Sequence, residues 1–200
     1  MERAVTRGSS GAAPVPASTA SCRRPLVVVV MGLRGAGKST VALALERELG
    51  LRRVCRDAIR DAMFPRCDYS FVEQRAAFRT VLLAVEINCL LGASTVVDGM
   101  TFARRQDFDQ LAALAAAHGA DVLPLLVECP PALARSRLML AAARGFRPGA
   151  ELPGRAASVL APPDPPSSAL RVDGTRPAAE TCRLAVAEVA ARLAPASAGA

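Results

Sequence analysis

The sequence predicts an α/β domain in which five parallel strands form one sheet that is covered by helices on both faces. Apolar runs of strand length alternate five times with helical periodicity, which is the pattern of a parallel sheet. The first run, Leu26–Met31, is uniformly apolar and rich in valine, as expected for a central strand that is buried on both faces. A glycine-rich stretch then leads directly into a helical pattern. Together these observations indicate a three-layer sandwich.

The remaining elements follow from the same two periodicities. In the helical segments, apolar residues recur along one face, and the segment 40–49 is followed by Gly50, a residue suited to ending a helix. We expect strands at 26–31, 52–55, 94–98, 122–128 and 170–172, and helices at 40–49, 58–64, 71–91, 105–118, 131–143 and 178–193.

The domain is expected to span residues 25–193. Residues 1–24 consist largely of Ser, Gly, Ala, Pro and Arg without periodicity and predict a disordered tail, and residues 194–200 predict a flexible one. Residues 144–168 are rich in proline and glycine and interrupt the alternation of strands and helices. This interruption indicates a mobile segment inside the domain, because it is too short and irregular to form a second one.

Composition and charge exclude several classes of protein. No apolar run approaches the roughly 18 residues that a membrane span needs. The chain has 25 basic and 18 acidic residues, and of its formal charge of +7 a local +3 lies in residues 1–24. The other +4 is spread along the chain, which favours mild attraction to phosphorylated ligands. With six Phe, one Tyr and no Trp, the sequence argues against a stacking surface for single-stranded nucleic acid.

The cysteines predict reduced thiols in a cytoplasmic protein. No two of them form a C-x-x-C pair, and His118 is the only histidine, so we expect neither a disulfide framework nor a zinc site. Several cysteines lie inside apolar stretches, where a thiol behaves as a small hydrophobic group. The six are Cys22, Cys55, Cys67, Cys89, Cys129 and Cys182.

Residues 32–40 form a complete phosphate-binding motif. The stretch Gly-Leu-Arg-Gly-Ala-Gly-Lys-Ser-Thr matches G-x-x-x-x-G-K-[ST] between a predicted strand and a predicted helix. Glycines let backbone N–H groups approach a phosphate, while Lys38, the only lysine, is placed to bridge the β- and γ-phosphates. Ser39 is a predicted Mg²⁺ ligand. The motif predicts a P-loop NTPase whose nucleotide-binding residues are Gly32, Gly35, Ala36, Gly37, Lys38, Ser39 and Thr40.

Asp98 is the second predicted Mg²⁺ ligand. It ends an apolar strand, which is the position of the metal-binding carboxylate in P-loop NTPases. Gly99 follows it where motor and transporter ATPases usually have a glutamate. GTPases are excluded because their Asn-Lys-x-Asp motif needs a lysine other than Lys38. A strand-end carboxylate without a metal is the alternative for Asp98.

Four further motifs carry a resemblance to a known family. They are Asp57-Ala-Ile-Arg60, Asp98-Gly-Met-Thr101-Phe102, Arg104-Arg105 and Pro131-Ala-Leu-Ala-Arg135-Ser-Arg137-Leu138. With the phosphate loop, they resemble P-loop kinases related to polynucleotide 5′-hydroxyl kinase, a group that includes short bacterial AAA-type ATP-binding proteins. The resemblance covers residues 25–193 and implies a nucleoside-kinase-like fold with a mobile lid.

The resemblance also implies an acceptor site. Asp57 would be the catalytic base that orients and deprotonates the acceptor hydroxyl, and Arg60 would hold an anionic part of the acceptor. Thr101 and Arg105 would bind the acceptor as well. The alternative is an N-cap aspartate followed by a surface arginine, which the spacing of Asp57 and Arg60 also explains well.

The lid is implied by arginines near the proline-rich segment. Arg137 would be the catalytic lid arginine that neutralises charge on the phosphates, with Arg144 and Arg147 as the other options. This region departs from the family pattern, because prolines replace the usual acidic Ser-Asp element after the lid helix. A solvated helix face is the alternative for each of these arginines.

The implied function is transfer of the γ-phosphate of ATP, with Mg²⁺, to a hydroxyl acceptor. We expect a small molecule rather than a 5′-hydroxyl nucleic-acid end, because the charge of the domain is modest. Two other classes stay open: an ATP-dependent switch or stand-alone ATPase, and a degenerate relative that binds ATP without turnover. The Asp57-x-x-Arg60 motif and the missing glutamate after Asp98 favour the kinase.

Overall fold

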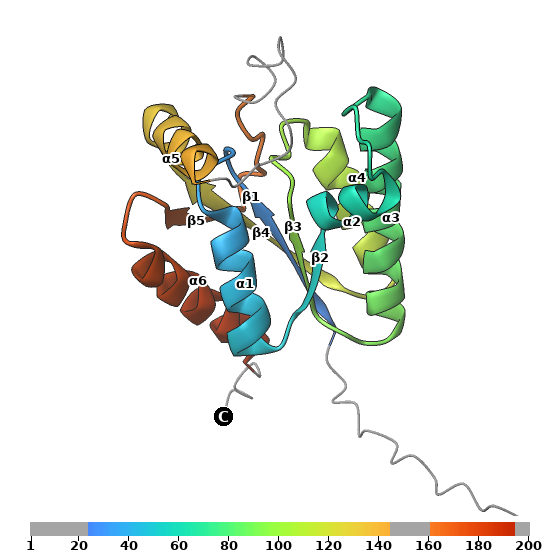
Figure 1. Cartoon of the computed structure of the whole chain (residues 1–200). Helices are drawn as coiled ribbons and strands as arrows, with labels where there is room; N and C mark the ends of the chain where they lie inside the picture. Colours follow the sequence, from blue (N-terminus) through green and yellow to red (C-terminus); the bar gives the residue numbers. More distant parts are fainter. Residues whose placement is uncertain (1–23, 145–160, 195–200) are drawn as a thin grey trace, which may run out of the picture.

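The computed structural model describes residues 24–144 and 161–194. At its centre is a five-stranded parallel sheet with the strand order β2-β3-β1-β4-β5 (Figure 1). This arrangement confirms the predicted fold class. The strands are β1 (Leu26–Met31), β2 (Arg52–Cys55), β3 (Thr95–Asp98), β4 (Asp121–Glu128) and β5 (Leu170–Asp173).

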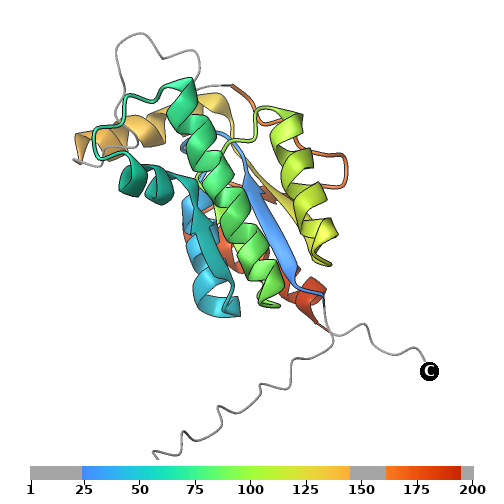
Figure 2. The same cartoon turned by 90° about the vertical axis from the view of Figure 1, so that its right-hand side faces the viewer.

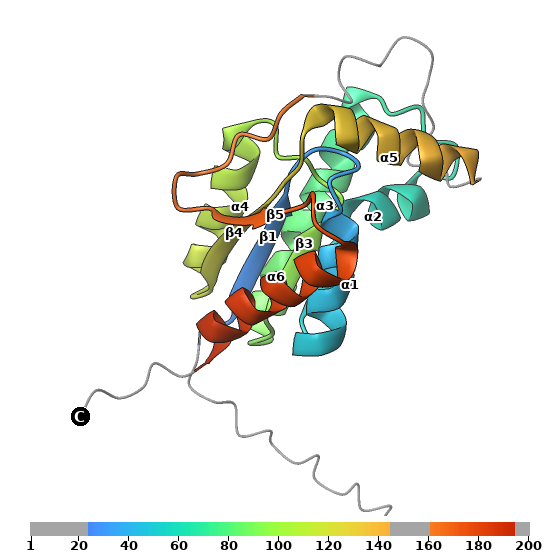
Figure 3. The same ribbon diagram turned by 90° about the vertical axis from the view of Figure 1, so that its left-hand side faces the viewer.

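Helices form a layer on each side of the sheet. α1 (Lys38–Leu49) and α6 (Ala178–Leu193) cover one face, as Figure 3 shows. α3 (Phe71–Leu90) and α4 (Arg105–Ala117) cover the other (Figure 2). The two remaining helices, α2 (Arg56–Met63) and α5 (Pro131–Ala143), follow the carboxyl ends of β2 and β4. None of the helices in the described residues has the length and apolar character needed to cross a membrane.

The central strand β1 explains why its sequence is a continuous apolar run. All six of its residues are buried. Val28 and Val30 face α1 and α6, whereas Val27 and Val29 belong to the core on the side of α3 and α4. Because both faces of the strand are covered, every position is apolar and none alternates to solvent. Burial of each such side chain contributes about 1.5–3 kcal/mol of transfer free energy.

Parallel pairing brings the carboxyl ends of the strands to one edge of the sheet. At this edge Cys55 of β2 pairs with Asp98 of β3, and α2 begins at the next residue, Arg56. The end of β1 leads into the glycine-rich loop at the same edge. The phosphate loop, Asp98 and the first turn of α2 therefore lie next to one another.

Two helices begin earlier than their sequence pattern indicates. α1 starts at Lys38 instead of residue 40, and α2 starts at Arg56 instead of residue 58. Cys55 is the N-cap of α2, so Asp57 lies inside the first turn. The alternative interpretation of Asp57 as an N-cap is therefore wrong: β2 passes directly into α2 without the extra residues that would have placed Asp57 at the cap.

The expected lid, 144–168, is described only in part. Arg144 is the C-cap of α5, and residues 161–168 lead toward β5. In this second part, the backbone N–H of Asp164 donates a hydrogen bond to the carbonyl oxygen of Phe102 at 2.9 Å, which ties the segment to the loop after β3. Arg147 and the rest of the lid lie outside the described residues, as do 1–23 and 195–200 of the expected tails.

Candidate active site

The phosphate loop connects β1 to α1 in a conformation that depends on glycine. Gly32, Gly35 and Gly37 all have positive φ angles, of 141°, 83° and 104°. A Cβ at Gly35 would lie 2.3 Å from the carbonyl oxygen of Ala134 in α5, and one at Gly32 would lie 2.6 Å from that of Val127. At Gly32 and Gly35 the loop therefore packs tightly against the backbone of its neighbours, and a side chain at either position would displace them.

Lys38 is buried at the start of α1, with 8% of its surface exposed. Its Nζ donates a hydrogen bond to the carbonyl oxygen of Leu33 within the loop, at 2.9 Å. Burial lowers the pKa of Lys38 to about 8, although the carboxylates of Asp98 and Asp57 act in the opposite direction. An ammonium held in this way lacks full hydration, and binding of phosphate oxygens would compensate for that loss.

Asp98 and Ser39 meet at the end of β3. The Ser39 hydroxyl donates to Asp98 Oδ1 at 3.2 Å, and the Asp98 side chain is fully buried. Arg53 of β2 pairs with Asp98 Oδ2 at 3.4 Å and with Glu46 at 3.0 Å. A hydroxyl and a carboxylate oxygen are hard ligands of the kind that Mg²⁺ takes when it also binds phosphates, so the two predicted ligands fit this ion.

Asp57 and Arg60 form an ion pair within α2. Arg60 donates to Asp57 Oδ1 at 2.7 Å and to Asp61 Oδ1 at 3.0 Å, and its guanidinium lies 4.6 Å from the centre of the Tyr69 ring. Half of the Asp57 side chain is exposed, whereas only 4% of Arg60 is. The arginine is therefore not the surface residue of the alternative interpretation. Its pairing with two carboxylates and a ring accounts for its burial.

The first turn of α2 lies close to the end of β3. Gly99, with φ of 84°, would place a Cβ 3.0 Å from the backbone nitrogen of Asp57 and 3.4 Å from its Cγ. This approach puts the Asp57 carboxyl beside the residue that follows Asp98. The carboxylates of Asp57 and Asp98 also both favour the charged form of Lys38. Lys38, Asp57 and Asp98 therefore lie close enough to interact electrostatically.

The other predicted residues are less closely grouped. Arg105 pairs with Asp109, one turn further along α4, at 2.8 Å, and Thr101 is half-buried in the loop after β3. Arg137 donates to the carbonyl oxygen of Gly174 at 2.8 Å, in the loop after β5. Gly174 in turn lies against Ala36 of the phosphate loop. The roles assigned to these residues stay predictions.

The sequence interpretation missed two arginines of this region. Arg53 holds Asp98 from the neighbouring strand, and Arg56 opens α2 directly before Asp57. Burial lowers the pKa of Arg56, and the nearby guanidinium groups of Arg60 and Arg34 lower it further. The position of Arg56, between a strand end and the predicted base, was the available signal. Arg53 gave none, because its partner lies 45 residues away.

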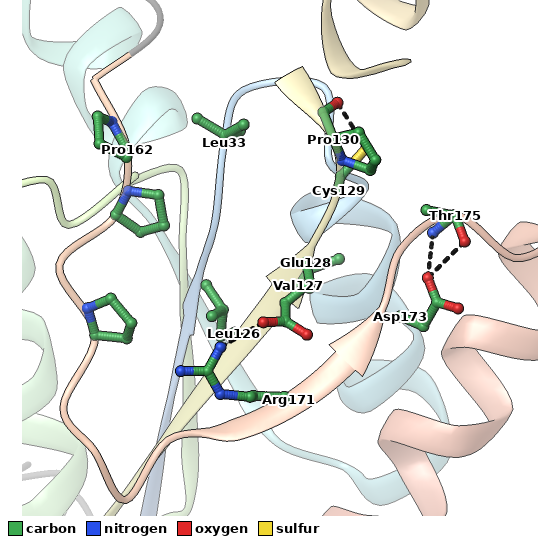
Figure 4. A pocket seen from close by; sticks show the side chains of 12 residues that line it. Leu33, Leu126, Val127, Glu128, Cys129, Pro130, Pro162, Arg171, Asp173 and Thr175 are labelled. Carbon is green, nitrogen blue, oxygen red and sulfur yellow. Dashed lines mark hydrogen bonds and ion pairs between the residues drawn. The ribbon is translucent and has the colours of Figure 1, made fainter. Parts of the chain in front are cut away.

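An open cavity of about 550 Å³ adjoins the phosphate loop on its other side (Figure 4). It is lined by Leu33, by the ends of β4 and β5 and by prolines of the segment 161–168, of which Figure 4 labels Pro162. Its polar groups are paired with each other: Arg171 with Glu128, and Asp173 with Thr175. Lys38, Asp57 and Asp98 do not line it.

A model of the AAA domain family matches residues 27–155. The chain belongs to this family. The match begins in β1 and extends past α5, so this AAA domain includes the phosphate loop, Asp57 and Asp98. It confirms the AAA-type P-loop resemblance found in the motifs. Among curated proteins, no significant match was found.

Solved structures place the AAA domain among P-loop kinase folds. A candidate kinase from Chloroflexus aurantiacus superposes with a TM-score of 0.69 at 20% identity, covering 86% of this chain and 98% of its own. A gluconokinase from Sinorhizobium meliloti superposes with a TM-score of 0.60 at 22% identity, covering 86% of this chain and 95% of its own. The APS kinase CysC of Mycobacterium tuberculosis, solved with AMPPNP and APS, superposes with a TM-score of 0.63 at 19% identity, covering 84% of this chain and 98% of its own. At these identities the likeness establishes the fold.

Proposed function

We propose that this protein is an ATP-dependent phosphotransferase that moves the γ-phosphate of Mg·ATP to a hydroxyl group of a small molecule. The observation that carries the proposal is the shared location of Lys38, the Ser39–Asp98 pair and Asp57 at one edge of the sheet. Residues that bind a triphosphate are common to all P-loop proteins and do not by themselves indicate a kinase. A half-exposed carboxylate beside those residues supplies what a hydroxyl acceptor needs.

Each residue has a role that follows from its chemistry. The backbone of residues 32–40 and the Lys38 ammonium would bind the β- and γ-phosphates and neutralise charge that develops on them. Ser39 and Asp98 would hold Mg²⁺, which when bound neutralises the phosphate oxygens. Asp57 would accept the hydrogen bond of the acceptor hydroxyl and fix it in line with the γ-phosphorus.

The transfer balances with these groups alone. The acceptor oxygen forms a bond to the γ-phosphorus, and the bond from that phosphorus to the β,γ-bridging oxygen breaks, which releases ADP. The hydroxyl proton passes to the Asp57 carboxylate and then to solvent. An arginine from the lid side, with Arg137 as the described candidate, would stabilise the transferring phosphoryl group if it left the Gly174 carbonyl.

A small-molecule acceptor is favoured by the neighbours in fold. The gluconokinase and the APS kinase are small-molecule kinases, and each is spanned almost completely by this chain. The second acceptor class is a 5′-hydroxyl nucleic-acid end, which the resemblance to polynucleotide kinases supports. The modest net charge of the chain gives it less support.

The proposal is tested by following labelled γ-phosphate from ATP in a cell extract supplemented with 5′-hydroxyl oligonucleotides. We expect label to move to a small organic acceptor, and the labelled product identifies it. Asp57→Asn should lower this transfer by about 10²–10⁴-fold, the usual contribution of a general base, while ATP binding persists. Glu188→Gln, an equal change of charge on the exposed surface of α6, should leave transfer unchanged.

Other outcomes assign other functions. Label released only as inorganic phosphate would indicate an ATPase or an ATP-dependent switch. ATP bound but never cleaved would indicate a degenerate binder. Label found only on the oligonucleotide would replace the small-molecule acceptor with a nucleic-acid end.

A further inference from the structure

Arg56 shares its nearest carboxylate with a second arginine. Arg56 is the first residue of α2, and 21% of its side-chain surface is exposed. Within the described residues, its nearest carboxylate oxygen is Asp57 Oδ1, at 3.7 Å, which is beyond hydrogen-bond distance. The same oxygen already accepts a hydrogen bond from Arg60 at 2.7 Å. One carboxylate is therefore shared between two guanidinium groups.

The two arginines also share an unusual feature. The Nε atoms of Arg56 and Arg60 are both buried, and neither has a hydrogen-bond partner in the described part of the chain. Buried donors of this kind are rare in folded proteins, because the loss of water is not repaid. Asp57 and Asp61 satisfy the terminal nitrogens of Arg60 but not its Nε.

The surroundings increase the positive potential. Arg34 and Arg60 are both near enough to lower the pKa of Arg56, and Arg34 and Arg56 both oppose the charge of Lys38. An anion at this place would therefore interact with several cations that now repel one another. The planar guanidinium of an arginine offers N–H donors in a fork that matches two oxygens of a carboxylate or a phosphate.

We propose that Arg56 is a second guanidinium of the acceptor site, beside Arg60, whose binding of an anionic part of the acceptor the family resemblance implies, so that the acceptor is a small hydroxy compound bearing a carboxylate or a phosphate. This inference rests on the proposed function, because it concerns the same site. The anion would lie beside Asp57 and thereby position the neighbouring hydroxyl for that carboxylate. Repulsion between the anion and Asp57 would be offset by the two guanidinium groups.

The first test measures anion binding without any need to know the acceptor. The full chain is saturated with Mg·AMPPNP, which occupies the phosphate loop, and is then titrated with inorganic phosphate while the melting temperature is followed. We expect a saturable rise that an equal ionic strength of chloride does not produce. Should AMPPNP fail to bind, the same titration is made with the Lys38→Ala chain, whose phosphate loop is disabled.

Variants assign this binding to Arg56. Arg56→Gln should weaken the phosphate affinity at least about 10-fold, as expected for loss of a charge-assisted pair, and Arg56→Lys should retain part of it. Arg183→Gln, an equal loss of charge on the exposed surface of α6, should match the wild type. No saturable phosphate effect, or the same affinity in Arg56→Gln as in the wild type, would overturn the proposal.

The second test determines the charge of the acceptor itself. A small-molecule extract, freed of nucleic acid by filtration, is separated on an anion-exchange resin into retained and unretained fractions. We expect labelled phosphate to move from ATP to a compound in the retained fraction, and phosphatase treatment of that fraction beforehand distinguishes phosphate from carboxylate acceptors. Transfer only to a compound in the unretained fraction would contradict the proposal. No transfer to either fraction would count against the kinase function, while the phosphate titration would still decide the anion site.

Discussion

At the scale of single residues, Lys38 holds a charge where little water reaches it. Its ammonium is buried beside the loop carbonyl of Leu33, and burial brings its pKa down to about 8. Phosphates bound to the loop would favour the ammonium and raise this pKa. Above pH 8 the free protein has therefore lost a proton that the nucleotide complex retains, and binding must take the proton up.

This linkage predicts the pH dependence of nucleotide affinity. The affinity for Mg·AMPPNP should fall by up to about 10-fold per pH unit above pH 8, because the unbound state is the deprotonated one. Calorimetry in buffers of different ionisation enthalpy should show proton uptake over the same range. In Lys38→Arg, whose side chain stays charged, any residual binding should not follow this profile. Equal wild-type affinities at pH 7.5 and 9.5 would contradict the assignment.

Single residues also mark the limit of what the sequence can predict. The loop motif identifies Lys38 and Ser39 because the chemistry of a phosphate demands them in that order. The acceptor role of Arg105 stays a prediction, and in the structure Arg105 pairs with Asp109 in the i,i+4 arrangement that any exposed helix can form. Arg53 gave no local signal because its partner Asp98 comes from another strand. Pairings between distant segments depend on strand order, and the pattern of elements does not contain it.

At the scale of elements, α5 is the helix whose backbone packs against the phosphate loop at Gly35. Its backbone approaches Gly35 so closely that a Cβ there would lie 2.3 Å from the Ala134 carbonyl oxygen. The helix begins with Pro131, and Pro suits the first turn because its missing N–H would be unpaired there. The phosphate loop thus packs against the helix that directly precedes the expected lid.

This contact predicts different effects for two glycines. Gly35→Ala should weaken nucleotide binding at least about 10-fold and destabilise the fold by about 1–3 kcal/mol, because it adds a backbone clash to an unfavourable φ. Gly50→Ala has a similar φ of 68° with open space around it, so it should cost about 1 kcal/mol without changing nucleotide affinity. Calorimetric titration and thermal unfolding of both variants check this. Equal nucleotide affinities for the two would show that α5 does not constrain the loop.

The elements themselves were predictable because periodicity is a local property. The β1 range 26–31 matches residue for residue, since a strand buried on both faces leaves an uninterrupted apolar run. The start of α2 did not match: it begins at Arg56, where no cap residue marks it. That shift of two residues moves Asp57 from the cap position of the alternative interpretation into the first turn. It also places Arg56 directly before Asp57 in that turn.

At the scale of the whole molecule, parallel topology makes the site from distant parts of the chain. β1 supplies the phosphate loop, β3 supplies Asp98, and the end of β2 supplies the helix that carries Asp57. Sites at the carboxyl edge of open α/β sheets arise in this way. The fold class could be predicted from alternation, whereas the grouping of Asp98 with the first turn of α2 could not, because it depends on the strand order of the sheet.

The most direct test of the central claim is the fate of one γ-phosphate in a single turnover. The wild-type chain and Asp57→Asn are each mixed in excess with γ-labelled Mg·ATP and a small-molecule extract, and labelled organic phosphate, inorganic phosphate and remaining ATP are separated and counted. The account predicts that label passes to an organic ester with the wild type and stays in bound ATP with Asp57→Asn. Inorganic phosphate as the only product with the wild type, or equal ester formation by the two proteins, would contradict it.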